Sequence, residues 1–321
     1  MSMRTFRLFV IFAAIAVMIG ACSYKDLVED GEGARRKLRI HYVWDNVDSI
    51  PQTMRLVFYP DDRNIYTRGY TVFDILSKDT TIELHTGRYG VTVWNTDFEH
   101  VITAGYTRQE EIYATTGNYS PHGDVTMPKV LDSLYNSQKV LDYPDYMVHA
   151  TEMEVSLPDN DEDHVLTLEP DSMVVTVDVI IHGIKGLEYC TNIRGAINNI
   201  PAKRLITHEN TTQEPVSVMF DGKKDYAADS TVQARFYLFG MEPSEQKRMS
   251  HKMVVFFWLT AGQVFMPVDV SKLVWATRPD DKYVLIELDA DLDLRDFLKG
   301  TPGMVVDAED WEDTEEIQIS F

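Results

Sequence analysis

Cys22 is the side chain whose setting points most clearly to a defined chemistry, which is covalent lipidation of a thiol. Arg4 and Arg7 form a short basic segment, Leu8–Gly20 is an unbroken apolar run, and small residues directly precede the thiol. The apolar run is shorter than the ~20 residues that a membrane-spanning helix needs. This pattern predicts a lipoprotein signal peptide over residues 1–21, cleavage before Cys22, and attachment of fatty acyl chains such as palmitate. An ordinary signal peptide followed by a chance cysteine is the alternative.

The cysteine content agrees with lipidation. Cys190 is the only other cysteine, so acylation of Cys22 leaves no intramolecular disulfide in a protein that is predicted to leave the reducing cytosol. A packed apolar core must therefore stabilise the fold. We expect Cys190 to be a small buried residue within that core.

The charge balance excludes some partners. The chain has 30 lysines and arginines against 51 aspartates and glutamates, which gives a formal net charge of −21. Binding to nucleic acid requires clustered positive charge, so we predict no nucleic-acid partner. A polybasic grip on anionic lipid is excluded for the same reason. The acyl chains on Cys22 are then the only predicted contact with the membrane.

The remaining reactive side chains form no catalytic or metal-binding motif. The chain holds no GxSxG, HExxH, CxxC or P-loop pattern, and its nine histidines are scattered. Asp289, Asp291 and Asp293 alternate, so their carboxylates would repel on one face of a strand, which solvent or a bound Ca²⁺ would relieve. The glycine and glutamate of an EF-hand are missing from this run. A solvated loop is favoured, and we predict a non-catalytic protein without a metal or cofactor.

Tyrosines are the best candidates for recognition. Several lie in the loop-rich stretch from Val101 to Tyr146, and a tyrosine presents both a flat apolar face and a hydroxyl. Such side chains stack on sugar rings or on a partner protein. The alternative, which is favoured, is that they fix a long loop onto the body of the protein. The predicted recognition loop comprises Tyr106, Tyr113, Tyr119 and Tyr135.

The apolar pattern of the first half has the period of two that is typical of half-buried strands. Strands are predicted at Lys37–Trp44 and Met54–Phe58, and Thr81–Asn95 is predicted to be a hairpin with its turn at Thr86-Gly87. Within the hairpin, Tyr89, Val91 and Val93 should share one face, with Thr92 and Trp94 on the other. A short helix is predicted at Val130–Val140.

The second half contains further strands. The acidic turn Asp159–Asp163 has no apolar member and is the predicted domain boundary. Alternation of Ile317, Ile319 and Phe321 with polar residues predicts a strand that ends at the last residue. The other predicted strands are Met173–Ile181, Val232–Phe239, Met253–Thr260, Gln263–Val270 and Tyr283–Leu288.

Many short strands with frequent turn signals predict an all-β fold of two tandem β-sandwich domains, the first with a loop-rich insertion. The predicted organisation is a signal peptide (1–21), a flexible tether (22–36), an N-terminal domain (37–160) and a C-terminal domain (161–321).

Several short motifs resemble those of one bacterial family. The lipobox cysteine is followed by Lys25-Asp26, the segment Leu84–Asn95 joins a turn to a strand, and Trp311 precedes the terminal strand. Together they resemble Bacteroidales lipoproteins of the fimbrial-anchor (FimB-like, fimbrillin-associated) group. The resemblance implies two transthyretin-like β-sandwiches, a lipid anchor at Cys22, and a surface-exposed location on the outer membrane. It also implies that Ile317–Phe321 pairs with a fimbrial subunit by β-augmentation.

Two functions follow from these features. The first is a non-catalytic, lipid-anchored surface protein that serves as anchor or accessory subunit of a fimbrial or adhesive assembly. The second is a glycan-binding lipoprotein of an outer-membrane uptake complex, which would use the tyrosines between residues 106 and 146.

Overall fold

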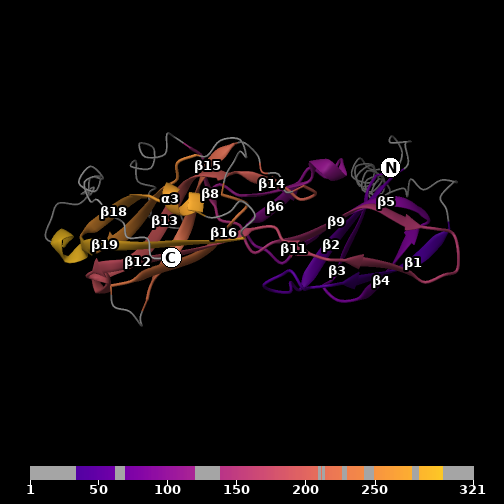
Figure 1. Ribbon diagram of the computed structural model, residues 1–321, viewed down its shortest axis with the longest axis horizontal. Coiled ribbons are helices and arrows are strands. Elements are labelled where there is room, and N and C mark those ends of the chain that lie inside the picture. The colour runs from indigo at the N-terminus through magenta and orange to yellow at the C-terminus, as the bar shows by residue number, and fades with distance from the viewer. Residues whose placement is uncertain are drawn as a thin grey trace, which may run out of the picture.

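The computed structural model describes residues 34–61, 69–119, 138–208, 211, 214–225, 230–241, 249–276 and 282–298. They form an elongated molecule with two halves that consist mainly of strands (Figure 1). The predicted all-β fold class is confirmed.

The N-terminal half is a sandwich of two sheets. A three-stranded sheet in the order β10-β1-β4 faces a five-stranded sheet in the order β11-β9-β5-β2-β3. Buried side chains from both sheets, among them Ile40, Leu56 and Val91, form one core between the sheets. The strands are β1 (Arg35–Tyr42), β2 (Thr53–Pro60), β3 (Thr71–Leu76), β4 (Thr80–His85), β5 (Gly87–Asn95), β9 (Val148–Leu157), β10 (His164–Leu168) and β11 (Asp171–Ser172).

The predicted hairpin at Thr81–Asn95 is wrong, although its two strands exist. β4 pairs with β1, whereas β5 pairs with β2 and β9, so the turn carries the chain from one sheet to the other. Ile82 and Val91 therefore belong to the same core but come from opposite sheets. A glycine-containing turn between two apolar strands occurs both in a hairpin and in a connection between two sheets. The alternating pattern specifies which face of each strand is buried, but it does not specify which strand pairs with which.

The predicted alternation in β5 is confirmed, but both of its faces are buried. Tyr89, Val91 and Val93 belong to the core of the sandwich. Trp94 belongs to a different apolar cluster on the outer face of the five-stranded sheet, and Thr92 is also fully buried. This second cluster lies where the two halves of the molecule meet.

The first strand begins earlier than expected. β1 starts at Arg35, within the stretch predicted to be a flexible tether, and Arg35 pairs with His85 of β4. The Arg36 guanidinium lies 2.7 Å from the Asp159 carboxylate in the acidic turn. Charged residues at a strand end face solvent, so the apolar pattern did not reveal them.

The C-terminal half is built from one eight-stranded sheet that folds over on itself. Its order is β18-β17-β13-β15-β16-β12-β19, and β8 pairs with β15 off this path. β15 and β16 pair only at Lys223 and Lys224, where the sheet bends. The strands are β8 (Val140–Asp142), β12 (Val175–Lys185), β13 (Cys190–Pro201), β15 (Pro215–Lys224), β16 (Val232–Leu238), β17 (Lys252–Leu259), β18 (Gly262–Asp269) and β19 (Tyr283–Asp293).

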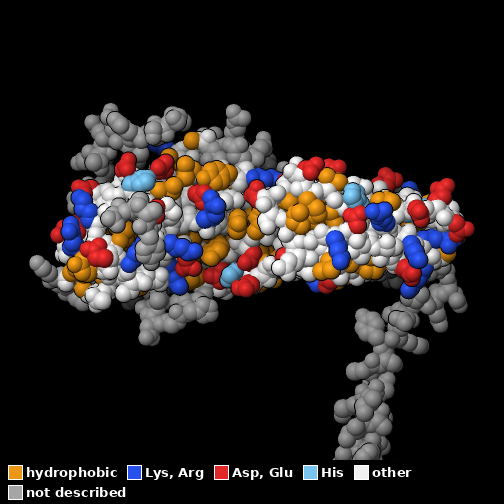
Figure 2. All heavy atoms as spheres, turned by 90° about the horizontal axis from the view of Figure 1, so that it is seen from below, with side chains coloured by type: hydrophobic (Ala, Val, Ile, Leu, Met, Phe, Trp, Pro, Cys, Tyr) orange, Lys and Arg blue, Asp and Glu red, His pale blue; other side chains and the backbone are white. Residues whose placement is uncertain are grey.

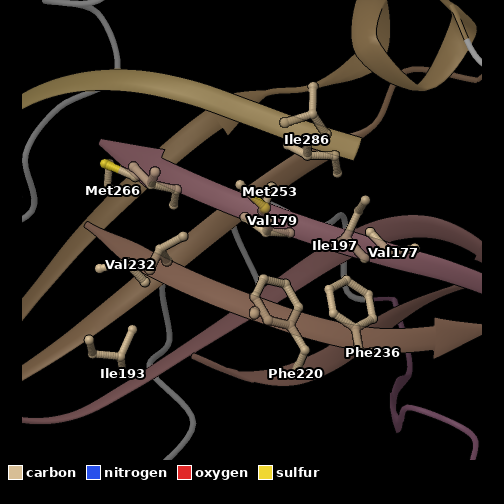
Figure 3. Packing of buried hydrophobic residues seen from close by; sticks show 14 of the residues in the cluster. Val177, Val179, Ile193, Ile197, Phe220, Val232, Phe236, Met253, Met266 and Ile286 are labelled. Carbon is tan, nitrogen blue, oxygen red and sulfur yellow. The ribbon is translucent and has the colours of Figure 1, made fainter. Parts of the chain in front are cut away.

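The core of this half lies between the two layers of the bent sheet. Val177 and Val179 of β12 point toward Ile197 and Met253 of the opposite layer (Figure 3). The rings of Phe220 and Phe236 stack with their centroids 4.3 Å apart. Cys190 is buried in this core, as expected. A short helix, α3 (Ser271–Ala276), follows β18.

The two halves are joined by more than one connection. Much of the predicted loop-rich insertion is ordered as β6 (Val101–Ala104), the 3₁₀ turn η1 (Gln109–Glu111) and β7 (Tyr113–Thr116). β7 pairs with β14 (Lys203–Leu205) of the C-terminal half, so β6, β7 and β14 form a small sheet at the junction (Figure 1). Val140, the end of the predicted helix, lies in β8 and pairs with Ser217 of β15. The rest of that predicted helix is outside the described residues except for positions 138 and 139.

The division of the chain at residue 160 stays a prediction. The acidic turn Asp159–Asp163 connects β9 to β10, and both of these strands belong to the N-terminal sandwich. By strand pairing, the chain adds β8 to the C-terminal sheet, returns to the sandwich for β9 and β11, and continues in the C-terminal sheet from Val175. We therefore propose that the domain boundary lies between Ser172 and Val175.

Candidate functional site

Four aromatic side chains form a row on the outer face of the five-stranded sheet. Tyr59 follows the core residue Phe58 in β2, and Trp94 follows Val93 in β5; because successive side chains of a strand point to opposite faces, both point outward. The ring centroids of Tyr59 and Tyr70 are 5.7 Å apart, and Tyr106 lies 5.8 Å from both Tyr70 and Trp94. We call Tyr59, Tyr70, Tyr106 and Trp94 the aromatic row.

Hydrogen bonds fix Tyr106 in this row. Its hydroxyl accepts a hydrogen bond from Arg55 Nη1 at 3.3 Å and is 2.7 Å from Thr103 Oγ1. The Tyr59 hydroxyl donates to the Tyr106 carbonyl at 2.9 Å, and burial raises the pKa of Tyr59 above its ordinary value. Tyr106 therefore fixes the chain after β6 onto the sheet, as the favoured interpretation of the tyrosines predicts.

An ion pair borders the row. Arg55 Nε and Nη2 donate to the two carboxylate oxygens of Asp74 at 2.7 Å each, in the bidentate geometry that arginine favours. The Arg55 guanidinium holds the pKa of Asp74 below its ordinary value. The side chain of Asp74 is 52% exposed, so its carboxylate still faces solvent.

Only one end of the row is open to a ligand. Trp94 is fully buried, whereas Tyr70 is 43% exposed and the neighbouring Val72 is 40% exposed. An exposed aromatic ring beside a carboxylate and a guanidinium offers a stacking face together with hydrogen-bonding groups. Such an arrangement suits a flat, hydroxyl-bearing ligand, and nothing in it positions a nucleophile or a general base. Tyr59, Tyr70 and Trp94 were absent from the sequence-based site, because only the fold brings them to Tyr106.

The other predicted tyrosines have separate contacts. Lys203 Nζ lies 4.8 Å from the ring centroid of Tyr113 at the small junction sheet. The Arg194 guanidinium lies 5.8 Å from the ring of Tyr119 and donates to its hydroxyl. Tyr135 lies outside the described residues. The role of these side chains in recognition stays a prediction.

Two aspartates near the C-terminal end of β19, Asp291 and Asp293, are paired with cations. Asp289, Asp291 and Asp293 lie in the strand β19, so the predicted solvated loop is wrong here. Lys185 Nζ lies 2.8 Å from Asp291, and hydrogen bonds from Arg295 lower the pKa of Asp293 to about 2. Within the described part of the chain, no three His, Cys, Asp or Glu side chains gather as a metal site would require.

Several sheet edges carry exposed apolar side chains. β3 ends the five-stranded sheet, and β10 and β19 end their own sheets, each with one ladder left unpaired among the described residues. Exposed apolar side chains on them are Val72, Leu76, Val165, Tyr283 and Leu285. Figure 2 shows apolar side chains lying between mixed acidic and basic groups on one face of both halves. The predicted partner strand, Ile317, Ile319 and Phe321, lies outside the described residues.

The predicted anchor, Cys22, also lies outside the described residues. Among the residues that the structure does describe, no helix combines the length and apolar character needed to cross a bilayer.

One curated relative has an informative name. A protein of Bacteroides ovatus, "Putative fimbrium anchoring subunit Fim4B", is 25% identical over 233 residues, which are 72% of this chain and 64% of that protein. The match thus spans less than two thirds of the relative's own length. The similarity confirms the expected resemblance to the fimbrial-anchor group.

Two crystal structures of Bacteroides ovatus proteins, each described as a "putative adhesin", share the fold. One is 20% identical with a TM-score of 0.60, and the match covers 89% of this chain and 98% of the other. The second is 12% identical with a TM-score of 0.52, and the match covers 79% of this chain and 89% of the other.

A family model described as "Domain of unknown function (DUF5119)" matches residues 21–221. This range includes the whole N-terminal sandwich, the junction sheet and the first strands of the C-terminal half. Because the match covers more than half of the chain, the protein belongs to the DUF5119 family.

Proposed function

We propose that this protein is a non-catalytic anchor or accessory subunit of a fimbrial or adhesive assembly on the cell surface. The observation that carries the proposal is the similarity over 233 residues to a protein named as a fimbrium anchoring subunit. That name describes anchoring and no reaction. Cys190, the one cysteine in the described residues, is buried and its pKa is raised by burial, so it has none of the features of a reactive thiol.

In this proposal, acyl chains on Cys22 hold the protein at the outer membrane. Fully extended, residues 22–34 would span at most about 45 Å, which limits how far β1 stands from the bilayer. The membrane contact would come from the acyl chains, because each buried CH₂ contributes about 0.8 kcal/mol and several chains together bind firmly.

The proposed partner is a fimbrial subunit that pairs with the strand at Ile317–Phe321. Backbone hydrogen bonds along a strand edge would provide affinity, and alternate side chains would provide specificity. The open edge at β19, with its exposed Tyr283 and Leu285, supports this type of assembly in the C-terminal half.

Crosslinking in native outer membranes, followed by purification and mass spectrometry, tests this proposal. We expect fimbrial subunits to be recovered with the unaltered protein. The Cys22→Ser variant should leave the membrane fraction, and deletion of Ile317–Phe321 should abolish recovery of the subunits while leaving membrane attachment intact. Recovery of a transporter with sugar-binding lipoproteins, and of no fimbrial subunit, would contradict the anchor role.

A second candidate function is glycan binding at the exposed end of the aromatic row. The observation that favours it is the position of the exposed Tyr70 ring next to Tyr106, whose hydroxyl contacts the Arg55–Asp74 pair. Sugar rings stack on aromatic faces while carboxylates and guanidinium groups bind their hydroxyls.

Affinity electrophoresis with a panel of polysaccharides tests glycan binding. We expect Tyr70→Ala to weaken binding roughly tenfold, as loss of one aromatic contact would. Tyr189→Ala is the matched control, because Tyr189 is similarly exposed but lies in the C-terminal half. An equal effect of the two variants would argue against a site at the aromatic row.

A further inference from the structure

In each half of the molecule, an early strand pairs in parallel with a late strand of the same half. Leu38–Tyr42 of β1 lie opposite His164–Leu168 of β10. In the C-terminal half, β12 pairs in parallel with β19 over nine residues, with one irregularity near His182. β1 is the first strand of the N-terminal half, and β10 is one of its last. In the C-terminal half, β12 follows β8, and β19 is the last strand that the structure describes.

The parallel direction determines how such a pair responds to tension. When the start of the first strand and the end of its parallel partner are pulled apart, the strands are pulled in opposite directions along their axes. All hydrogen bonds between them then bear the load together. In an antiparallel pair those two ends are adjacent, so the same pull would open the ladder one bond at a time.

The first strand of each parallel pair is itself paired on both sides. β1 lies between β10 and β4, and β12 lies between β19 and β16. Sliding of β1 would therefore disrupt two ladders and expose Leu38 and Ile40, which are buried in the core.

Several contacts hold the two halves together at the junction. The apolar cluster at the junction contains Trp94 from the N-terminal half and Ile206 and Phe239 from the C-terminal half. Arg204 Nη1 donates to the Met173 carbonyl at 2.7 Å, and the rings of Tyr146 and Tyr237 are 5.6 Å apart. The pairs β7–β14 and β8–β15 add backbone hydrogen bonds.

We propose that this protein is built to resist tension along its length, with β1–β10 and β12–β19 as two shear-loaded clamps. That the load comes from a filament held to the membrane rests on the proposed function. The mechanical property itself depends only on the strand directions and is measured on the isolated protein.

Single-molecule force spectroscopy on the full chain carrying Cys22→Ser tests the proposal, with handles on introduced cysteines. The buried Cys190 should not react. For the N-terminal clamp, handles on Ala34→Cys and Asp171→Cys load β1–β10 in shear. The matched control uses Ala34→Cys with Asp163→Cys, which pulls on adjacent ends of the two strands and peels them apart.

The C-terminal clamp is tested in the same way. Asp171→Cys with Asp296→Cys loads β12–β19 in shear, and Asp171→Cys with Lys282→Cys peels the same pair. For each clamp we expect the rupture force in the shear geometry to exceed that in the peeling geometry by roughly twofold or more, because forced unfolding follows the unfolding rate along the pulling direction.

Equal forces in the two geometries would overturn the proposal. Both geometries use the same fold, so a change in overall stability does not alter the comparison. Failure to recover fimbrial subunits from the membrane would leave this result unaffected.

Discussion

The parallel pair of the N-terminal half, β1 with β10, extends over five residues, whereas that of the C-terminal half, β12 with β19, extends over nine. The core of the C-terminal half is also the larger one, because its cluster of buried apolar residues has more members than that of the N-terminal sandwich. If length of pairing and burial determine resistance, the N-terminal half should open first. The half nearer the predicted anchor is therefore expected to be the more compliant one.

The largest expected effect comes from removing a core ring. Phe236→Ala should lower the free energy of unfolding of the C-terminal half by about 3–5 kcal/mol, because it leaves a cavity and removes the stack on Phe220. Hydrogen exchange of backbone amides measures the two halves separately. We expect faster exchange in β12, β16 and β19, with β1 and β10 less affected.

The equivalent change in the other half is Leu56→Ala, which should cost about 2–5 kcal/mol and act mainly on β2 and β5. If both variants raised exchange equally in both halves, the molecule would unfold as one unit and the comparison between the halves would fail.

A second prediction concerns the coupling between the halves. Arg204→Ala removes the hydrogen bonds to the Met173 and Phe239 carbonyls at the junction and should cost about 1–3 kcal/mol. In calorimetry we expect the two halves to unfold in more widely separated transitions. Arg235→Ala is the control, because Arg235 pairs with Asp178 on the surface. An unchanged unfolding profile of the Arg204 variant would show that the apolar cluster and the strand pairs at the junction couple the halves without Arg204.

A third prediction concerns pH. Burial lowers the pKa of His149 in β9 to about 4, and Arg204 and Lys282 add to this, whereas Asp171 opposes it. The unfolded chain binds this proton at pH values near 6.5, so stability due to neutral His149 is present above pH 6.5 and is lost as the pH falls toward 4. Urea midpoints at pH 7, 5.5 and 4 measure the loss. In the His149→Gln variant the urea midpoint should depend less on pH between 7 and 4. An unchanged dependence would show that carboxylates, and not His149, cause the loss of stability.

The smallest expected effect is at the surface. Arg36→Ala breaks the pair with Asp159 next to the acidic turn, where both side chains are partly exposed. Exposed pairs contribute roughly 0.2–1 kcal/mol, so the urea midpoint should change little, and less at 1 M salt than at low salt. A loss above this range would mean that the start of β1 is more tightly held than the comparison of the halves assumes.

The local pattern of the sequence predicted burial well and strand pairing poorly. Alternation in Tyr89–Trp94 identified both faces of β5, and the β-branched run at Met173–Ile181 predicted most of β12. The hairpin at Thr86-Gly87 failed because a turn does not specify the sheet to which each strand belongs. The acidic turn at Asp159–Asp163 connects two strands of the N-terminal sandwich. Polar composition is typical of any exposed connection, so it does not distinguish a domain boundary from a turn within a sandwich.

The site was predicted only in part. Tyr106 was singled out, but its neighbours Tyr59 and Tyr70 are distant in sequence and meet it only through the pairing of β2 with β3 and β5. Tyr59 lies on a strand with the alternating pattern and Tyr70 directly precedes one, yet the pattern does not show whether an outward aromatic residue joins a cluster or stands alone. The aspartates on β19 were misinterpreted because Lys185, which pairs with Asp291, is distant in sequence, whereas Arg295 lies two residues after its partner Asp293 and its pairing was overlooked.

The pairing of β7 with β14 has a consequence for biogenesis. β7 is synthesised long before its partner β14 (Lys203–Leu205). The separation in sequence is larger still between β1, which begins at Arg35, and its parallel partner β10, which begins at His164. Contacts between residues so far apart in sequence form slowly. A growing or freshly exported chain would therefore expose unpaired strand edges until the later strands have been made and exported. We expect it to depend on chaperones that cover these edges.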